Sequence, residues 1–286
     1  MAAAVTICLA AALLAGCGGR RGEPTPPEWS PPAGSAPSAR PGHPGARGGG
    51  TERSALAIYY VGPTPAGPRL YREFHSVATR GDAASAAARE LLDGHPDDPD
   101  YRSAWPSGWT LRGPVRHAGG TITVDLSGPG GPDAPADATW ALRQLVYTVQ
   151  GALGSNDPVR VLRDGAAISQ LWGVAQPMAR GEPVQLRSLV QIDNPPAGAR
   201  IGRRVTVSGE ADVFEATVLW QVLRGGADGQ VVAHGSASTA EGQRFSPYSF
   251  VLILPPGRYT LRVAGQDLSN GEGHAPFSDT KTITVS

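Results

Sequence analysis

Residues 137–154 read DATWALRQLVYTVQGALG, and this stretch decides the fold class of the first folded segment. Its apolar positions recur three or four residues apart, at Ala138, Leu142, Leu145, Val146, Val149 and Leu153. This spacing places them on one face of an α-helix. Asp137 is a typical N-cap residue, and Gly154 stands just past the last periodic position, where glycine commonly ends helices. The stretch therefore predicts an amphipathic helix that packs on a sheet.

Strand-like runs surround this helix. Runs rich in β-branched and aromatic residues cover 55–61, 70–78, 109–115, 121–126 and 158–162, and a last run ends at Trp172. A second helix is predicted over 83–92, capped by Asp82, and Gly119-Gly120 predicts a hairpin turn between two of the strands. The order β, β, α, β, β, α, β, β predicts an α+β sandwich with two helices on one face of a sheet.

After residue 184 helical periodicity disappears. Short strand-like runs, separated by Gly, Pro and Asp/Asn turns, cover 189–192, 205–208, 217–223, 230–233, 250–254, 258–264 and 281–285. About seven short strands in roughly 100 residues are typical of an all-β immunoglobulin-like sandwich. The absence of a cysteine pair in this segment excludes only the antibody subtype.

The N-terminus has the pattern of an exported lipoprotein. Residues 2–16, AAAVTICLAAALLAG, are uncharged and shorter than the roughly 20 residues of a membrane-spanning helix, which predicts a signal peptide. Leu14-Ala15-Gly16-Cys17 resembles the bacterial lipobox, which implies that the thiol of Cys17 receives diacylglycerol. The alternative is a general secretory leader with an incidental cysteine. The basic residues that usually precede the apolar run are missing.

These observations predict the domain organisation. Cys8 would leave with the leader and Cys17 would carry lipid, so the mature chain would form no disulfide. Several acyl chains on Cys17 predict stable anchoring on the extracytoplasmic face of the cell membrane. The predicted segments are a lipoprotein signal peptide over 1–16, a Pro/Gly-rich disordered tether over 17–52, an α+β domain over 53–183 and an immunoglobulin-like domain over 184–286.

Composition and motifs favour a non-catalytic protein. Twenty-five basic side chains balance 25 acidic ones, which argues against nucleic acid as a partner. No Gly-x-Ser-x-Gly, Walker, Gly-x-Gly-x-x-Gly or His-Glu-x-x-His motif occurs, so neither an enzyme nor a cofactor is predicted.

No metal site is predicted either. The six histidines form no i, i+4 pair, and a zinc site would need ligands brought together from distant parts of the chain. The acidic stretch His95–Asp100 lacks the glycine and the distal glutamate of an EF-hand, so a solvated loop is predicted there.

Two families share short motifs with this chain. The first segment resembles the GerMN domain of sporulation and spore-germination proteins, in chain order through Tyr59-Tyr60-Val61, Glu90-Leu91-Leu92-Asp93-Gly94, Pro106-Ser107-Gly108-Trp109, Val124-Asp125-Leu126-Ser127, Gln144-Leu145-Val146-Tyr147-Thr148 and Val159–Gly165. The second resembles the immunoglobulin-like domain of bacterial spore germination, through Ile192–Pro195, Val205–Gly209 and Val213–Val218. The resemblance implies a GerMN-like α+β domain followed by an immunoglobulin-like sandwich, without established catalysis.

The functional hypothesis combines these elements. Resemblance to GerMN lipoproteins of actinobacteria implies a cell-surface accessory factor that binds envelope proteins, either in complex assembly or in modulation of a sensor kinase. A role in sporulation or germination is suggested by the family name alone. The predicted partners are the membrane, through the N-terminal lipid, and an envelope protein. The alternative is a protein that binds peptidoglycan or another glycan of the cell wall.

Four side chains are candidate partner contacts. Trp105 and Trp109 flank Pro106, and partly exposed rings there could stack on sugars. Phe214 and Glu215 lie in the segment that resembles the immunoglobulin-like family. The favoured interpretation of Glu215 is structural, with its carboxylate accepting backbone N–H groups. The alternative is a docking point for a partner.

Overall fold

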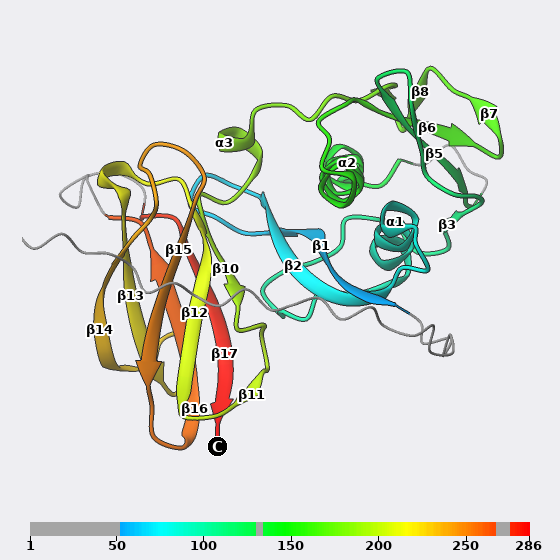
Figure 1. Cartoon of the computed structure of the whole chain (residues 1–286). Coiled ribbons are helices and arrows are strands. Elements are labelled where there is room, and N and C mark those ends of the chain that lie inside the picture. The colour runs from blue at the N-terminus through cyan, green and yellow to red at the C-terminus, as the bar shows by residue number, and fades with distance from the viewer. Residues whose placement is uncertain (1–51, 130–133, 267–274) are drawn as a thin grey trace, which may run out of the picture. The chain divides into compact units, whose positions relative to one another are not determined.

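The computed structural model describes residues 52–129, 134–266 and 275–286. These residues belong to one compact unit, Gly49–Ser286, which contains two separate hydrophobic cores. The N-terminal lobe runs from β1 to α3 and the C-terminal lobe from β10 to β17 (Figure 1). The expected signal peptide, Cys17 and the expected tether up to residue 51 lie outside the described residues.

The described part of the N-terminal lobe contains three sheets, one of which is the short β8–β9 pair, and three helices. Its helices are α1 (Ala83–Asp93), α2 (Ala138–Leu153) and the short α3 (Pro183–Leu186). Its strands are β1 (Arg53–Gly62), β2 (Arg69–Ala78), β3 (Thr110–Leu111), β4 (Arg116–Ala118), β5 (Thr121–Ser127), β6 (Val159–Arg163), β7 (Ala166–Ala167), β8 (Gln170–Leu171) and β9 (Val174–Ala175).

The helices of this lobe pack between strands. β1 and β2 form an antiparallel pair, whereas β3, β5, β6 and β7 follow one another in a second sheet with β4 paired to β5. β5 and β6 are parallel, and α2 connects them. Figure 1 shows α1 and α2 between the β1–β2 pair and the sheet that contains β5 and β6. The α+β class is confirmed, but the strands divide into three sheets instead of one, with β8 and β9 forming a small separate pair.

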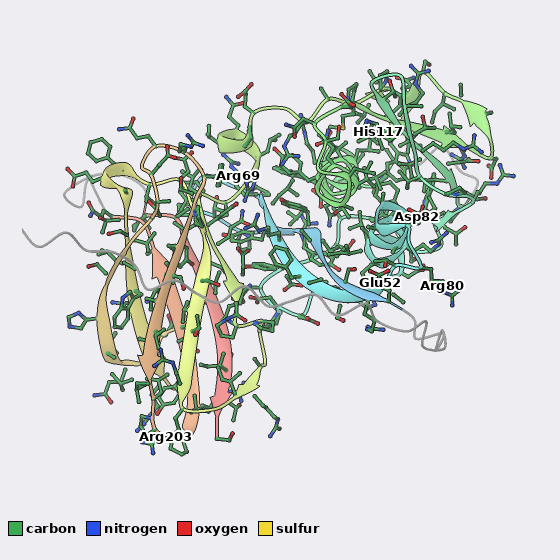
Figure 2. All side chains as sticks on the ribbon, viewed as in Figure 1. Glu52, Arg69, Arg80, Asp82, His117 and Arg203 are labelled. Atoms are coloured by element: carbon green, nitrogen blue, oxygen red, sulfur yellow. The ribbon has the colours of Figure 1, made fainter. Side chains whose placement is uncertain are left out.

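The helix ends follow local chemistry. The Asp82 carboxylate accepts a hydrogen bond from the amide of Ser85 at 2.9 Å and caps α1 (Figure 2). Gly154 ends α2 in the left-handed conformation with φ of 62°. Asp137 stands at the N-cap of α2 but makes no cap hydrogen bond. Its carboxylate instead pairs with Arg102 at 2.9 Å, so the predicted cap contact at Asp137 is wrong.

The hairpin turn at Gly119-Gly120 is confirmed between β4 and β5. Both glycines have positive φ, 57° and 68°, as a two-residue hairpin turn with a right-handed strand twist requires. The preceding run 109–115 is not a single strand, because only Thr110–Leu111 pairs there and Trp109 packs into the core.

The C-terminal lobe is a sandwich of two sheets, as predicted. The first sheet has the order β10 (Val190–Asn194), β12 (Arg204–Ala211), β15 (Ser246–Ile253). The second has the order β11 (Arg200–Ile201), β17 (Ser278–Val285), β16 (Gly257–Ala264), β13 (Thr217–Arg224), β14 (Gln230–Ser238). Alternate residues of both sheets form the core, among them Val205, Val207, Val218, Val222, Leu261 and Val263.

One close approach fixes the first sheet. The Tyr248 hydroxyl donates to the Gln191 carbonyl at 2.9 Å. A Cβ atom at Gly209 would collide with that carbonyl and with the Tyr248 hydroxyl, so only glycine fits at this position of β12.

Candidate functional site

Lys281 is the only lysine in the chain, and its side chain is buried in the structure. Strand β17 alternates, so that Asp279 and Lys281 point to the same side as the core residues Ile283 and Val285. Lys281 is 2% exposed, which is unusual for an ammonium group unless it is paired. Its partners therefore decide how this part of the molecule is held together.

The partners of Lys281 come from both lobes. Its Nζ lies 2.6 Å from Asp98 Oδ2 and donates to the Tyr101 hydroxyl at 2.7 Å. Tyr101 in turn donates to Asp279 Oδ1 at 2.6 Å, and the other oxygen of Asp279 accepts the amide of Ile192 at 2.7 Å. Asp98 and Tyr101 follow α1 in the N-terminal lobe, whereas Asp279, Lys281 and Ile192 belong to the C-terminal lobe. We call Asp98, Tyr101, Asp279 and Lys281 the lysine cluster.

Burial sets the charges of the lysine cluster. Burial raises the pKa of Asp279 to about 6, although Lys281 acts in the opposite direction. Burial likewise raises the pKa of Asp98. Burial lowers the pKa of Lys281, but Asp279 and Asp98 outweigh it and place that pKa above its ordinary value. One permanent cation therefore faces two carboxylates with little water nearby.

A second ionic group joins the lobes beside the lysine cluster. The Arg72 guanidinium of β2 binds both oxygens of Asp193, at 2.8 and 2.7 Å, and lies 3.0 Å from Glu210 Oε2. Arg187 donates to the same Glu210 oxygen at 2.6 Å. Burial raises the pKa of Glu210, but Arg72 and Arg187 outweigh it and hold that pKa below its ordinary value. The fork geometry of Arg72 makes this contact directional.

The acidic stretch after α1 is exposed at His95, Asp97, Pro99 and Asp100, as a solvated loop would be, but Asp98 departs from the prediction. Asp98 is 2% exposed because it pairs with Lys281, and its neighbour Asp97 lies beside Glu73 and His75 of β2. The Glu73 carboxylate accepts the amides of Asp97 and Asp98, both at 2.8 Å. Glu73, His75 and Asp97 offer ligand atoms within 4.8 Å of one another, a grouping that the sequence spacing does not indicate.

His75 lies between two carboxylates. Its Nδ1 is 2.8 Å from Glu90 Oε1 of α1, and its Nε2 is 3.2 Å from Glu73 Oε2. Burial lowers the pKa of His75, but the hydrogen bonds to Glu73 and Glu90 outweigh it and raise that pKa to about 9. The arrangement can hold either a proton or a cation at the ring.

The predicted partial exposure of Trp105 and Trp109 is wrong. The two side chains are 7% and 4% exposed. Their rings pack edge to face with ring centroids 6.1 Å apart. The ring centroid of Trp172 lies 5.4 Å from that of Trp105 and 5.0 Å from that of Trp109. Three indoles therefore cover one another, and neither ring presents an open face to a sugar.

Phe214 and Glu215 lie at the surface before β13. Phe214 is 48% exposed, and Glu215 is exposed in a 3-10 turn with φ of 56°. Within the described ranges the Glu215 carboxylate accepts no backbone hydrogen bond, so the structural contact favoured for this side chain is not found there. Cys17 lies outside the described residues.

Sequence reasoning missed the lysine cluster, although a signal for it exists. In 278–285, SDTKTITV, the alternation that places Ile283 and Val285 inside also places Asp279 and Lys281 inside. Two opposite charges on a core face indicate a buried pair. No comparable signal marks Asp98 or Tyr101.

Replacing Lys281 with methionine tests the lysine cluster. The variant keeps the volume but leaves two buried carboxylates without a cation, so we expect it to lower the free energy of unfolding by about 3–5 kcal/mol. Urea denaturation at pH 7 measures this value. The control is Arg244→Met, because Arg244 forms an exposed pair with Glu241 and its removal should cost less than about 1 kcal/mol. Equal losses in the two variants would contradict the assigned role of Lys281.

The raised pKa of Asp279 predicts a pH dependence. The native state holds the proton up to about pH 6, whereas the unfolded chain releases it near 3.8, so this stabilisation is present below pH 4 and is lost as the pH rises through 6. The groups that face Asp279 are Lys281, Asp98, Tyr101, Tyr71 and Tyr248.

Asp279→Asn isolates this pH dependence, because its amide does not titrate. We expect the stability of the wild type relative to the variant to fall by about 2 kcal/mol between pH 4 and pH 7. Urea midpoints at half-unit steps of pH measure the difference. A constant or rising difference would show that Asp279 has no raised pKa.

Comparison with known proteins gives the family of each lobe. Residues 57–169 match the model of Germane, described as sporulation and spore germination. Residues 189–272 match the model of Gmad2, described as the immunoglobulin-like domain of bacterial spore germination. The Germane model covers the segment whose motifs resemble GerMN, and the Gmad2 model covers the segment whose motifs resemble the immunoglobulin-like family. Among curated proteins, none matches the sequence.

Two solved structures are similar at low identity. The tandem GerMN domains of the sporulation protein GerM from Bacillus subtilis share 12% identity at a TM-score of 0.35, over 71% of this chain and 62% of that one. An engineered protein shares 14% identity at a TM-score of 0.24, over 54% of this chain and 37% of that one. The chain thus spans 62% of the length of the GerM structure.

No helix in the described ranges is long and apolar enough to cross a membrane. The two family matches follow each other along the chain without overlap. The protein therefore carries a GerMN-type sporulation and spore germination domain followed in tandem by the immunoglobulin-like domain of bacterial spore germination.

Proposed function

We propose that this protein is a non-catalytic accessory factor that binds envelope proteins on the extracytoplasmic face of the cell membrane, in a process related to sporulation or germination. Both matched domains are of the germination accessory type and neither is a known enzyme family. The lipobox-like sequence before Cys17 supports anchoring by an N-terminal lipid. Of the two roles considered, assembly of an envelope complex and modulation of a sensor kinase, the surface of the C-terminal lobe favours assembly.

The uncharged edges of the sandwich carry the proposal. β14 and β15 each stand at the end of a sheet, and neither contains an Asp, Glu, Lys or Arg residue. Both expose aliphatic side chains, with Val231 and Val232 on β14 and Val251 and Ile253 on β15. Ile253 is 64% exposed, the highest value among the large apolar side chains of the described residues.

Uncharged edges are suited to pairing with another chain. An edge strand presents free N–H and C=O groups, and soluble proteins usually protect such edges with charges, prolines or bulges. β14 has one bulge near Val232, after which Ala233–Ser238 pairs regularly with β13. Within the described ranges, the bridge Thr239–Tyr248 is the backbone pairing that joins the two edges. An extended segment of an envelope protein could add to β14 as a further strand.

The glycan-binding alternative has less support. It rests on open aromatic faces at Trp105 and Trp109, and the tryptophan packing described above closes both. Binding to cell-wall polymer therefore remains an outcome of the test and not part of the proposal.

Cross-linking in cells tests the β14 contact. A photoreactive phenylalanine analogue placed at the exposed His234 should form an adduct with an envelope protein on irradiation, which mass spectrometry identifies. We expect Ser236→Lys with Ser238→Lys to lower the yield at least tenfold, because two charges on the edge oppose strand addition. The control is Thr206→Lys, an exposed position on the central strand β12, which should leave the yield unchanged.

Two outcomes of the cross-linking experiment would reject this proposal. One is an adduct with the same yield in the edge and control variants, because it would not depend on β14. The other is recovery of peptidoglycan fragments alone, which would favour the glycan-binding alternative.

The lipid anchor predicts a defined N-terminus. Mass spectrometry of the mature protein should find Cys17 as the first residue, with its mass increased by diacylglycerol. Cys17→Ser should abolish that modification and remove the protein from the membrane fraction, whereas Cys8→Ser should not, since Cys8 lies in the predicted leader. A mature chain with unmodified Cys17 would refute lipid anchoring and leave the β14 contact to be judged separately.

A further inference from the structure

A group of potential metal ligands lies in the N-terminal lobe, away from the lysine cluster and from the edges of the sandwich. Glu73 and His75 are two residues apart on β2, so their side chains emerge on the same face. Asp97 comes from the loop after α1, and the ligand atoms of the three residues lie within 4.8 Å of one another. Glu73 and His75 are buried and Asp97 is exposed, which leaves a path from solvent.

The distances fit shared coordination of one ion. Two ligand atoms of a tetrahedral zinc ion, each about 2.1 Å from the metal, lie about 3.3–3.4 Å apart. Nε2 of His75 and Oε2 of Glu73 are 3.2 Å apart. Asp97 is exposed and can rotate toward them, so no backbone movement is required for a third ligand.

Glu90 supplies the outer contact that metal-bound histidines usually have. A ligating imidazole commonly donates its other N–H to a carboxylate, which fixes the tautomer and the ring orientation. Nδ1 of His75 lies 2.8 Å from Glu90 Oε1. If Nδ1 keeps its proton and a metal displaces the proton of Nε2, the lone pair of Nε2 faces Glu73.

A buried hydroxyl without a partner points independently to a missing ligand. Tyr60 is fully buried, and its hydroxyl has no hydrogen-bond partner among the described residues. Its ring lies 5.7 Å from that of His75. Burial raises the pKa of Tyr60, and the negative charges of Glu73, Glu90 and Asp97 act in the same direction. A buried polar atom of this kind usually finds a partner in a bound water or ion.

Charge also favours a cation here. Three carboxylates, Glu73, Glu90 and Asp97, surround one imidazole, so the group is negative in either protonation state of His75. A divalent ion offsets that excess. One imidazole nitrogen with carboxylate oxygens suits zinc or manganese better than calcium, which takes oxygen ligands alone.

We propose that Glu73, His75 and Asp97 bind one divalent transition-metal ion, with Glu90 orienting His75 and the Tyr60 hydroxyl contacting a water on the metal. The opposing interpretation is an imidazole that only neutralises two carboxylates. Only the metal site predicts that added metal binds with a stoichiometry of one and that this binding depends on Glu73, His75 and Asp97.

Zinc titration of the full-length protein tests the site. The protein is purified in detergent, stripped with EDTA and titrated with zinc chloride at pH 7.5 by calorimetry, and bound metal is counted by mass spectrometry. We expect one equivalent of zinc, with calcium at least 100-fold weaker. Asp97→Asn should lower zinc affinity at least tenfold, and because Asp97 is exposed the variant should keep its melting temperature without metal. Glu73→Gln should lower the affinity further.

Two more variants separate the site from incidental binding. His117→Asn is the matched control, because His117 forms an exposed pair with Asp157 at 2.6 Å, and it should leave zinc binding unchanged (Figure 2 labels His117). Tyr60→Phe should weaken zinc binding without lowering the melting temperature of the metal-free protein, since its hydroxyl loses no described partner.

Three results would overturn the proposed metal site. The first is less than half an equivalent of bound zinc in the wild type. The second is equal affinity in the wild type, Asp97→Asn and Glu73→Gln. The third is loss of binding in His117→Asn, which would assign the zinc to the surface. None of these bears on the β14 contact, so the two proposals fail separately.

Discussion

The burial of Lys281 between Asp98 and Asp279 is the constraint on which the arrangement of both domains depends. A buried ammonium group is costly unless donors and acceptors surround it, and this one finds them only when the loop after α1 meets β17. A buried ionic group of this kind contributes less to net stability than apolar packing would, but it tolerates few alternative geometries. The bidentate contact of Arg72 with Asp193 adds a second directional restraint beside it. The two domains are therefore joined by charged contacts whose geometry is restrictive.

Glu73 connects this restraint to the candidate metal site. Its carboxylate accepts hydrogen bonds from the backbone amides of Asp97 and Asp98 and so holds this loop in place. The side chains of these two residues have different partners. Asp98 reaches Lys281, while Asp97 remains beside His75. An ion held by Glu73 and Asp97 would fix the loop that presents Asp98 to the other domain. In the proposed metal-bound state, metal binding and domain contact would share one short segment.

The sequence predicted helices and strands well where one face of the element is apolar. It did not predict contacts between side chains that lie far apart along the sequence. The 3.6-residue spacing over 138–153 and the alternation in 217–224 are local patterns, and both elements form as expected. Asp98 lies in a stretch whose acidity and prolines suggest solvent, and its burial depends on Lys281, 183 residues away. Trp105 and Trp109 flank a turn, which suggests exposure, but Trp172 covers them. Glu73 and His75 share a face by simple alternation, yet Asp97 joins them only through the path of the loop.

The strand edges of this protein differ in whether side chains bond to their backbone N–H and C=O groups. At β1, the backbone N–H of Tyr59 donates to Thr148 and its C=O accepts from Gln144, which explains the burial of these two polar side chains of α2. At β10, the amide of Ile192 bonds to the Asp279 carboxylate. At β1 and at β10, side chains thus bond to backbone groups at the edge of a strand. β14 and β15 contain no charged residue, and each exposes two aliphatic side chains among other exposed residues. Edges elsewhere in the described part of the chain are satisfied by side chains, whereas β14 keeps an uncharged edge, and this contrast is what supports the proposed strand addition at β14.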